Sequence, residues 1–186
     1  MDDNQDRLLA QRLVQLRTAR QWSLDQLAQQ TGISRATLSR IERAETSPTA
    51  TLLGKLAQTF GMTMSQLLRE IEESPPELLT RENQPVWHDR ETGFERRSVS
   101  PPTQGFRAEL IEGRLRAGAS IHYENAPVAG MQQQIWLLAG ALEYSLGDRT
   151  WLLAPGDCLR FLLNGPSHFY APGPADAHYA IVICRT

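Results

Sequence analysis

The sequence predicts a multi-domain α + β protein in which an all-helical N-terminal domain precedes an all-β C-terminal domain. Three observations carry this prediction. Apolar residues recur at helical spacing up to about residue 73, a polar, proline-bearing segment follows, and short β-type runs separated by glycine and proline fill the rest. A chain of 186 residues that is 41% hydrophobic can bury two modest cores. We therefore divide the chain into a domain at 1–73, a linker at 74–85 and a second domain at 86–186.

The composition is typical of a globular protein without a membrane segment. No stretch approaches the roughly 18 consecutive apolar residues of a membrane span, and the first residues, Met1 to Asp6, are polar and acidic, unlike a signal peptide. We therefore expect a soluble, cytoplasmic protein with no membrane partner. Cys158 and Cys184 lie in apolar runs without a Cys-x-x-Cys pair, so reduced, buried thiols are expected.

The N-terminal domain is expected to contain five helices. The first runs from about Asp6 to Arg20, with leucines recurring on one face. The fourth and fifth follow the capping residues Thr49 and Thr63, and the apolar face of the fifth extends to Ile71.

Residues 23–43 indicate two short helices joined at a glycine. Ser23 with Gln26 three residues later forms a capping box that starts one helix. Gly32 stands where that helix has to end in a left-handed conformation, and Ser34 is a fresh N-cap for the next. The chain direction therefore changes sharply between the two helices.

The second of these helices is expected to expose a basic face that reads DNA. Its candidate DNA-binding residues are Ser34, Arg35, Ala36, Ser39, Arg40 and Arg43. Arginine forks match guanine edges and a methyl group can contact thymine in the major groove, whereas Ser34 and Arg43 at the helix ends suit the phosphate backbone. Between Arg7 and Arg43, seven arginines against two acidic residues give a local balance of +5, although the whole chain carries −2. A double-stranded DNA operator is the expected partner.

These helices resemble the five-helix DNA-binding domain of phage lambda repressor and Cro, which belongs to regulators of the xenobiotic-response-element type. The resemblance covers about residues 7–72 and rests on Leu16-Arg17, Leu27-Ala28, Gly32-Ile33-Ser34 and Leu38-Ser39-Arg40-Ile41-Glu42. It implies that Arg17 pairs with Glu42 and is structural. The chain departs from many members at Leu24, where they have glutamine, so the phosphate contact of that position stays open.

The C-terminal domain is expected to be a sandwich or barrel of short strands. The expected strands are 106–115, 132–138, 141–146, 150–153, 157–163, 167–170 and 177–184. This half resembles the cupin family, whose fold is a jelly-roll barrel. The hairpin at 133–142, the turn Pro155-Gly156-Asp157 and the segment Pro166-Ser167-His168 carry the resemblance, which covers about residues 106–184.

The ligand set of metal-binding cupins is largely missing. That family holds a first-row divalent metal with histidines and a glutamate. Here the glutamate position falls on Gln133, the first histidine positions fall on non-ligand residues near Ala126 and Val128, and only His168 is retained. We therefore expect no metal and no other cofactor. A rearranged site built from His122, Glu124 and His168 stays open as an alternative.

Without a metal, the barrel interior is expected to hold a small polar metabolite. The candidate ligand-binding residues are Gln133, Tyr144, His168 and Tyr170. Amide, imidazole and phenol groups amid apolar walls offer donors and acceptors without a fixed charge. Core packing is the alternative for each of them, and the facing of Trp136 and Arg160 is ambiguous.

Together, the two resemblances imply a sequence-specific DNA-binding transcription regulator, not an enzyme, whose cupin domain senses a small-molecule effector. A homodimer is expected to hold two recognition helices about 34 Å apart on a near-palindromic site. Two alternatives stay open: a metal-dependent cupin enzyme with an accessory helical domain, and a module whose five helices bind another protein. Repression and activation are equally compatible with the sequence.

Overall fold

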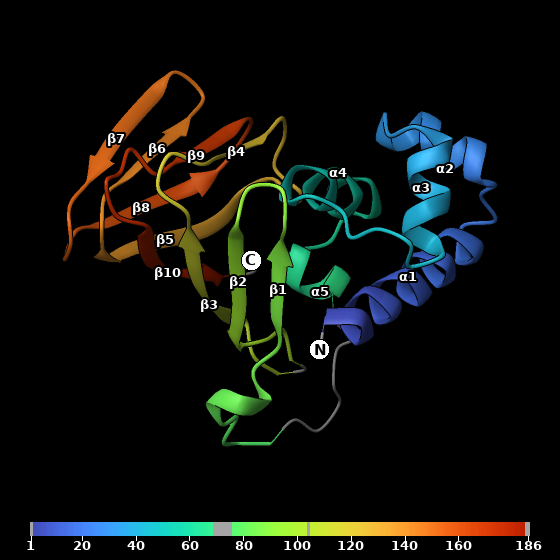
Figure 1. The fold of residues 1–186 in the computed structure, drawn as a ribbon, viewed down its shortest axis with the longest axis horizontal. Helices are drawn as coiled ribbons and strands as arrows, with labels where there is room; N and C mark the ends of the chain where they lie inside the picture. The colour runs from blue at the N-terminus through green and yellow to red at the C-terminus, as the bar shows by residue number, and fades with distance from the viewer. Residues whose placement is uncertain (1, 69–75, 104, 185–186) are drawn as a thin grey trace.

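The computed structural model describes residues 2–68, 76–103 and 105–184 and places a helical region beside a β region (Figure 1). The helices are α1 (Asp2–Ala19), α2 (Leu24–Thr31), α3 (Arg35–Glu42), α4 (Ala50–Phe60) and α5 (Met64–Leu68). This arrangement confirms the predicted five-helix N-terminal domain and the α + β fold class. Ile71 and the predicted boundary between residues 73 and 74 lie outside the described residues.

The helices begin and end at the signals found in the sequence. Ser23 Oγ accepts a hydrogen bond from Gln26 N at 3.2 Å, and Gln26 Oε1 accepts one from Ser23 N at 2.7 Å, which completes the capping box. Thr63 begins α5 with the same pattern. Gly32 ends α2 at φ 67°, in the left-handed region that glycine adopts without steric cost.

The described residues of the C-terminal half form two antiparallel sheets. The strands are β1 (Val86–Asp89), β2 (Phe94–Ser100), β3 (Ala108–Leu115), β4 (Ser120–Tyr123), β5 (Met131–Ala139), β6 (Leu142–Leu146), β7 (Arg149–Leu153), β8 (Cys158–Leu163), β9 (Ser167–Tyr170) and β10 (Ala177–Cys184). One sheet has the order β1-β2-β3-β10-β5-β8 and the other β4-β9-β6-β7. Phe169 of one sheet stacks on Tyr179 of the other at 6.0 Å between ring centroids, so the inner faces meet as in a jelly-roll sandwich. The all-β prediction is confirmed.

Three strands, β1, β2 and β4, were not predicted. In β2 the inward positions are Phe94, Arg96 and Ser98, so two of the three buried side chains are polar. Hydrophobic alternation therefore does not mark this strand. β4 is short, and an η1 turn at Arg81–Asn83 lies within the predicted linker.

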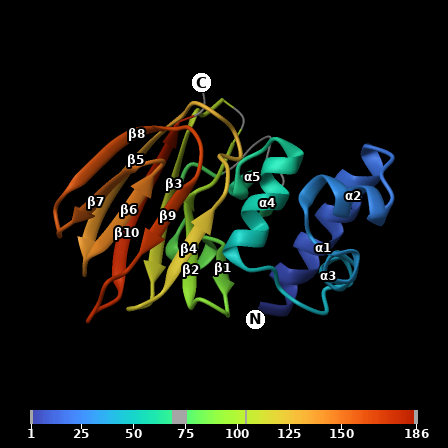
Figure 2. The same cartoon turned by 90° about the horizontal axis from the view of Figure 1, so that it is seen from above.

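Helices α4 and α5 lie between the rest of the helical region and the β region (Figure 2). At the start of α4, Ala50 N donates a hydrogen bond of 2.7 Å to Asp89 Oδ2 of β1. In its middle, the backbone of Gly54 approaches the Tyr123 ring of β4 so closely that an added Cβ would lie 2.6 Å from Cδ1. One continuous buried cluster joins Leu53 of α4 to the barrel interior. The two regions are therefore packed directly against each other.

The prediction of buried cysteines is wrong for Cys158. Cys158 is exposed, Cys184 is half-buried, and both are free thiols. The reason is the alternation of β8, which points Leu163 inward and Cys158 and Leu162 outward. The outer face of this sheet also exposes Trp136. None of the described helices is long and apolar enough to span a membrane.

Candidate functional site

Helix α3 packs one face into the helical core and turns the other to solvent, on the side of the molecule away from the barrel (Figure 2). Leu38 and Ile41 on its inner face are each 1% exposed. Ser34 Oγ caps the helix by accepting a hydrogen bond from Thr37 N at 3.1 Å. A capped, well-packed helix has a fixed position in the domain, so its outer residues are presented on one defined face.

The six predicted DNA-binding residues lie together on or beside this outer face. Ser34, Arg35, Ala36, Arg40 and Arg43 are exposed, and Ser39 is half-buried. Arg35 Nε lies 3.1 Å from Asp25 Oδ1 of α2, and both side chains are largely exposed. Such a surface ion pair is weak enough to open for a nucleic-acid contact.

Arg43 is held more firmly than the sequence indicates. Its Nη1 donates to Ser39 Oγ at 2.6 Å, and its Nε donates to Glu45 Oε1 at the same distance. The hydrogen bond from Arg43 lowers the pKa of Glu45, so this carboxyl stays charged and competes with a phosphate for the guanidinium. Glu45 had no role in the sequence-based prediction.

Two of the counted arginines support the fold and not the exposed face. Arg17 donates from Nε to Glu42 Oε1 at 2.7 Å, as the family resemblance implied. Arg20 donates from Nη1 and Nη2 to the carbonyls of Thr59 and Phe60, and its guanidinium lies 5.1 Å from the centroid of the Trp22 ring. The positive charge available to DNA is therefore smaller than the local balance of +5. Leu24 packs against the core.

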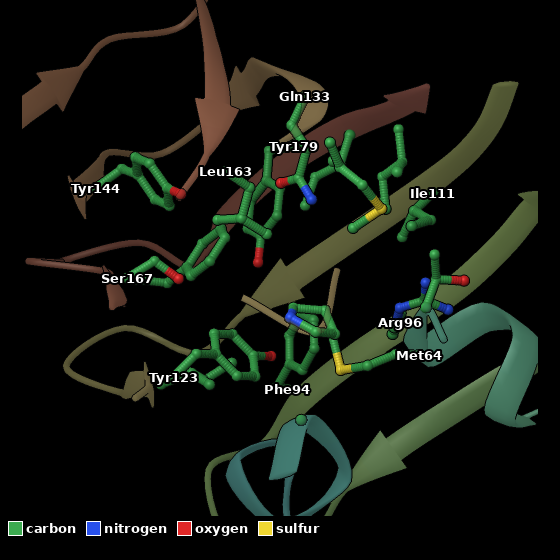
Figure 3. A pocket seen from close by; sticks show the side chains of 18 of the residues that line it. Met64, Phe94, Arg96, Ile111, Tyr123, Gln133, Tyr144, Leu163, Ser167 and Tyr179 are labelled. Carbon is green, nitrogen blue, oxygen red and sulfur yellow. The ribbon is translucent and has the colours of Figure 1, made fainter. Parts of the chain in front are cut away.

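The second candidate site is a cavity of about 70 Å³ inside the barrel, next to α4 and α5 (Figure 3). Its walls are mostly apolar. Gly54, Thr63 and Met64 of the helical region contribute to the lining beside residues from the strands. The polar groups from the strands are Arg96, Tyr123, Gln133, Tyr144, Ser167 and Tyr179. Both domains therefore meet at this cavity.

Two of the four predicted ligand-binding residues line the cavity. Gln133 is 8% exposed and points inward from β5, and the fully buried Tyr144 points inward from β6. The other two require a correction. His168 and Tyr170 lie on the opposite face of β9, where their rings stack 6.5 Å apart, because the inward positions of this strand are Ser167 and Phe169.

The three cavity tyrosines are neutral hydrogen-bonding groups. Burial raises the pKa of Tyr123, Tyr144 and Tyr179. The Tyr144 hydroxyl is buried next to Ser167, whose hydroxyl opposes the effect of burial on the pKa of Tyr144.

Arg96 of β2 is the cavity residue that sequence reasoning missed most clearly. Its side chain is buried, with Nη2 2.6 Å from Ser65 Oγ of α5 and Nη1 3.3 Å from Ser98 Oγ. Burial lowers the pKa of Arg96, and the charge of Glu109 acts in the opposite direction. Residues 95–98 are all polar, so there was no alternation of apolar residues from which the inward side chains of β2 could be found.

The residues at the metal positions of the cupin family do not fit a metal centre. Gln133 points into the barrel, whereas His168 points outward and lies beside His122, 6.1 Å away between ring centroids. Glu124 instead pairs with Lys55 Nζ at 2.9 Å. The rearranged site is therefore not assembled, and across the part of the chain that the structure describes, no three His, Cys, Asp or Glu side chains cluster as a ligand set.

Comparisons with known proteins match this geometry. Residues 13–67 match the family model described as helix-turn-helix. The HTH-type transcriptional regulator SutR of Escherichia coli (strain K12) is 29% identical over 171 residues, which is 92% of this chain and 90% of that protein.

Two solved structures share the fold of the whole chain. An HTH_3 family transcriptional regulator from Vibrio cholerae is 24% identical, covers 100% of this chain and 99% of its own, and superposes with a TM-score of 0.79. The structure of HppE with Fe(II) is 17% identical with a TM-score of 0.52, over 96% of this chain and 98% of its own. At these identities both show the fold alone.

The matched residues run from the middle of α1 into α5 and include the whole of α2 and α3. Their capped helices, the left-handed Gly32 between them and the Arg17–Glu42 pair form the scaffold that the family resemblance implied. Residues 13–67 of this chain therefore form a helix-turn-helix domain, and a β domain of two antiparallel sheets follows it.

Proposed function

We propose that this protein is a transcription regulator that binds operator DNA through α3 and responds to a small molecule held in its barrel. The observation that carries the proposal is the outer face of α3, where Arg35, Ala36 and Arg40 are all exposed. Similarity to SutR, whose name describes an HTH-type transcriptional regulator, supports the same function.

The contacts divide into two kinds. Arg35, the first residue of α3, and Arg40, in its last turn, reach base edges in the major groove, where an arginine fork pairs with guanine. Ser34 and Arg43 lie at the two ends of α3 and contact phosphates, which sets the register. To do so, Arg43 exchanges its bond with Glu45 for one with a phosphate oxygen.

The DNA-binding unit is a homodimer. One chain carries one α3, and a single recognition helix reads one half-site. Two copies related by a two-fold axis place their recognition helices about 34 Å apart, one turn of DNA, and select a near-palindromic operator.

The effector acts from the cavity. Because Gly54, Thr63 and Met64 of the helical region line it together with barrel residues, a ligand there contacts both domains. It shifts DNA affinity only by as much as its affinities for the two domain arrangements differ. The likeness to HppE does not favour an enzyme, since the residues at the cupin metal positions do not converge.

Selection of binding sites from random double-stranded DNA with the full-length protein tests this function. We expect an enriched near-palindrome, and light scattering of the complex that gives two chains per site. The double variant Arg35→Ala/Arg40→Ala is the matched control and should lose the enrichment while keeping its helical circular dichroism. Enrichment of single half-sites by a monomer would remove the dimer, and no enrichment at all would remove the DNA-binding function.

A further inference from the structure

We infer that the barrel cavity takes a small uncharged carboxamide with a short apolar body, that Tyr123, Tyr179 and Gln133 bind its amide group, and that Tyr123 passes binding on to helix α4. This inference rests on the proposed sensing function, because it names the chemical class of the effector and the residue that couples it to the helical region.

Two phenol groups line the cavity without a hydrogen-bond partner. Tyr179 is 1% exposed and Tyr123 is half-buried. Within the part of the chain that the structure describes, nothing hydrogen bonds to either hydroxyl. Buried polar groups are almost always paired, so two unpaired hydroxyls at one cavity indicate a ligand that accepts their hydrogen bonds.

Both phenols are directed to the same space. Each ring packs on Phe169, at 6.1 Å between centroids for Tyr123 and 6.0 Å for Tyr179. Burial and then the nearby Tyr123 phenol raise the pKa of Tyr179, so the two groups are electrostatic neighbours. Figure 3 shows both hydroxyl oxygens pointing into the space between the lining side chains. A carbonyl oxygen, which has two lone pairs, can accept from both hydroxyls.

Gln133 supplies the complementary groups. It is 8% exposed, it lines the cavity, and no described residue hydrogen bonds to its side-chain amide. This amide offers both N–H donors and an acceptor oxygen, whichever way it is turned. A carboxamide ligand can therefore accept from the phenols through its carbonyl and donate an N–H to Gln133 Oε1. A ligand with acceptors only would leave the Gln133 oxygen unpaired.

The charged residue of the cavity wall does not require a charged ligand. Arg96 is hydrogen-bonded to the hydroxyls of Ser65 and Ser98. The buried Glu109 carboxylate also acts on Arg96 electrostatically. A carboxylate ligand would have to leave water and would add a negative charge to a site whose arginine already has a carboxylate neighbour. An uncharged ligand avoids both costs.

The size of the cavity limits the body of the ligand. A volume of about 70 Å³, at roughly 10–15 Å³ for each water-sized group, holds about five to seven non-hydrogen atoms. An amide group takes three of them, which leaves about two to four carbons. Phe94, Ile111 and Met131 supply apolar walls, which suit a short hydrocarbon chain.

Tyr123 also carries the contact between the barrel and α4. Its ring lies against the backbone of Gly54, where an added Cβ would be 2.6 Å from Cδ1. The residues on either side of Tyr123 meet the same helix. The His122 carbonyl accepts a hydrogen bond of 3.1 Å from α4, and Glu124 Oε1 lies 2.9 Å from Lys55 Nζ. Of these three consecutive residues, only Tyr123 lines the cavity.

A ligand bonded to the Tyr123 hydroxyl therefore acts on the ring against which α4 packs. Helix α4 packs on α2, and α2 packs on α3. A ligand that favours one position of this ring favours one position of α4, and it changes DNA affinity by as much as its affinities for the two positions differ. Tyr179 instead packs against Gly113 of β3, inside the barrel.

The test of the ligand class uses the full-length protein and titration calorimetry at neutral pH. Each probe set has one shape, in which the amino group of an amide is replaced by a carboxylate oxygen or by a methyl group. The sets are propionamide, propionate and methyl ethyl ketone; butyramide, butyrate and methyl propyl ketone; and isobutyramide, isobutyrate and methyl isopropyl ketone. At least one amide should bind about tenfold more tightly than its carboxylate and its ketone.

The outcomes separate this inference from the proposed function. A carboxylate that binds more tightly than its amide, or a ketone that binds equally well, would overturn the carboxamide and leave sensing intact. Binding of none of the probes would overturn both the carboxamide and sensing of a small ligand in this cavity. Operator binding by the ligand-free protein, measured on the same sample, tests the regulator independently.

Two variants test the binding groups one at a time. Tyr179→Phe removes only a hydroxyl and should weaken amide binding about fivefold. Gln133→Met keeps the volume but loses the amide, so an amide and its ketone should bind equally. Tyr170→Phe removes a hydroxyl on the outer face of β9 and is the matched control, with wild-type binding. Wild-type affinity in Tyr179→Phe, or an amide preference that survives in Gln133→Met, would contradict these roles. If a variant does not keep the wild-type circular dichroism, the probe sets on the wild type still decide the ligand class.

Transmission is tested by comparing Tyr123→Phe with Tyr179→Phe. Both variants lose one cavity hydroxyl, but only the ring of Tyr123 lies against α4. At a saturating concentration of the amide, operator affinity should change about fivefold in the wild type and in Tyr179→Phe, and should change little in Tyr123→Phe. Fluorescence anisotropy of labelled operator DNA measures these affinities. Equal responses in the two variants, or no response in the wild type, would overturn transmission through Tyr123 and leave the ligand class intact.

Discussion

Arg17 and Glu42 form a bidentate pair that ties the end of α1 to the end of α3. The bonds run from Nε to Oε1 at 2.7 Å and from Nη2 to Oε2 at 2.9 Å, and a third bond of 2.9 Å joins Nη1 to the carbonyl of Trp22. The side chains are only 16% and 8% exposed. The pair therefore sets the angle at which α3 leaves the helical core.

Replacing Arg17 by alanine should lower the free energy of unfolding by about 2–4 kcal/mol, because Glu42 is left partly buried without its partner. Urea denaturation of the full-length protein measures this change. Arg43→Ala is the control, since its ion pair with Glu45 is exposed and should contribute nothing measurable. An equal loss in both variants would contradict a special role for the Arg17 pair.

Arg35→Ala and Arg40→Ala should each cost about 1–3 kcal/mol of binding free energy on the selected operator and relax preference at one base position. Arg43→Ala should weaken all sequences alike and reduce the slope of log affinity against log salt by about 1. Competition assays with single-base operator variants at several salt concentrations separate the two effects. Unchanged specificity in Arg35→Ala and Arg40→Ala would show that α3 does not read the bases.

Asp89→Ala should loosen the junction between the two domains. The buried carboxylate accepts bonds from the backbone of Ala50 at 2.7 Å and from Glu91 and Thr92 at 2.9 and 3.3 Å. Leaving these donors unpaired should cost about 2–3 kcal/mol of unfolding free energy. Asp89→Asn, which keeps the shape and one acceptor oxygen, should lose less. Amide hydrogen exchange at the start of α4 should be faster in Asp89→Ala than in the wild type and Asp89→Asn. This result would place the loss of stability at the junction between the two domains.

Glu112 on the outer face of β3 should make stability depend on acid pH. Burial raises the pKa of this carboxyl, but the hydrogen bond with His178, at 2.8 Å, and nearby arginines outweigh burial, so the net pKa lies below 4.5. A lowered folded-state pKa contributes stability above the unfolded value, and this contribution disappears as the pH falls through the folded value.

The difference in urea midpoint between the wild type and Glu112→Gln should therefore be largest near neutral pH and shrink below about pH 4.5. The comparison cancels the titration of other carboxyls. A difference that stays constant down to about pH 3 would show that the Glu112 charge is not responsible.

Local signals predicted the helical half well. Caps such as Ser23 and Ser34 act on backbone groups a few residues away, so their sequence spacing determines the geometry. The Arg17–Glu42 contact spans 25 residues, and only the family resemblance indicated it. Glu45 and Arg20 were missed because their partners depend on how turns and helices meet in space.

The barrel interior was harder to predict because a shift of one residue reverses the face of every side chain in a strand. The segment around Pro166 identified β9 with its correct limits, yet it is Ser167, and not His168, that faces the cavity. Arg96 escaped detection because a buried cation breaks the apolar alternation that marks an inward strand face. Residues of α4 and α5 that line the cavity were not predicted, because local sequence patterns do not show which helices pack against the barrel.

The close approach of Gly54 to the Tyr123 ring restricts how this architecture can be recombined. Any side chain at position 54 would meet the aromatic ring unless α4 moved away from β4. A chimera that joins these five helices to a foreign barrel, or this barrel to foreign helices, has to preserve that glycine–tyrosine contact along with the junction at Asp89. A reporter fusion that joins only one of the two domains at residues 74–85 would lose the interface between them. A functional chimera therefore has to exchange the whole chain.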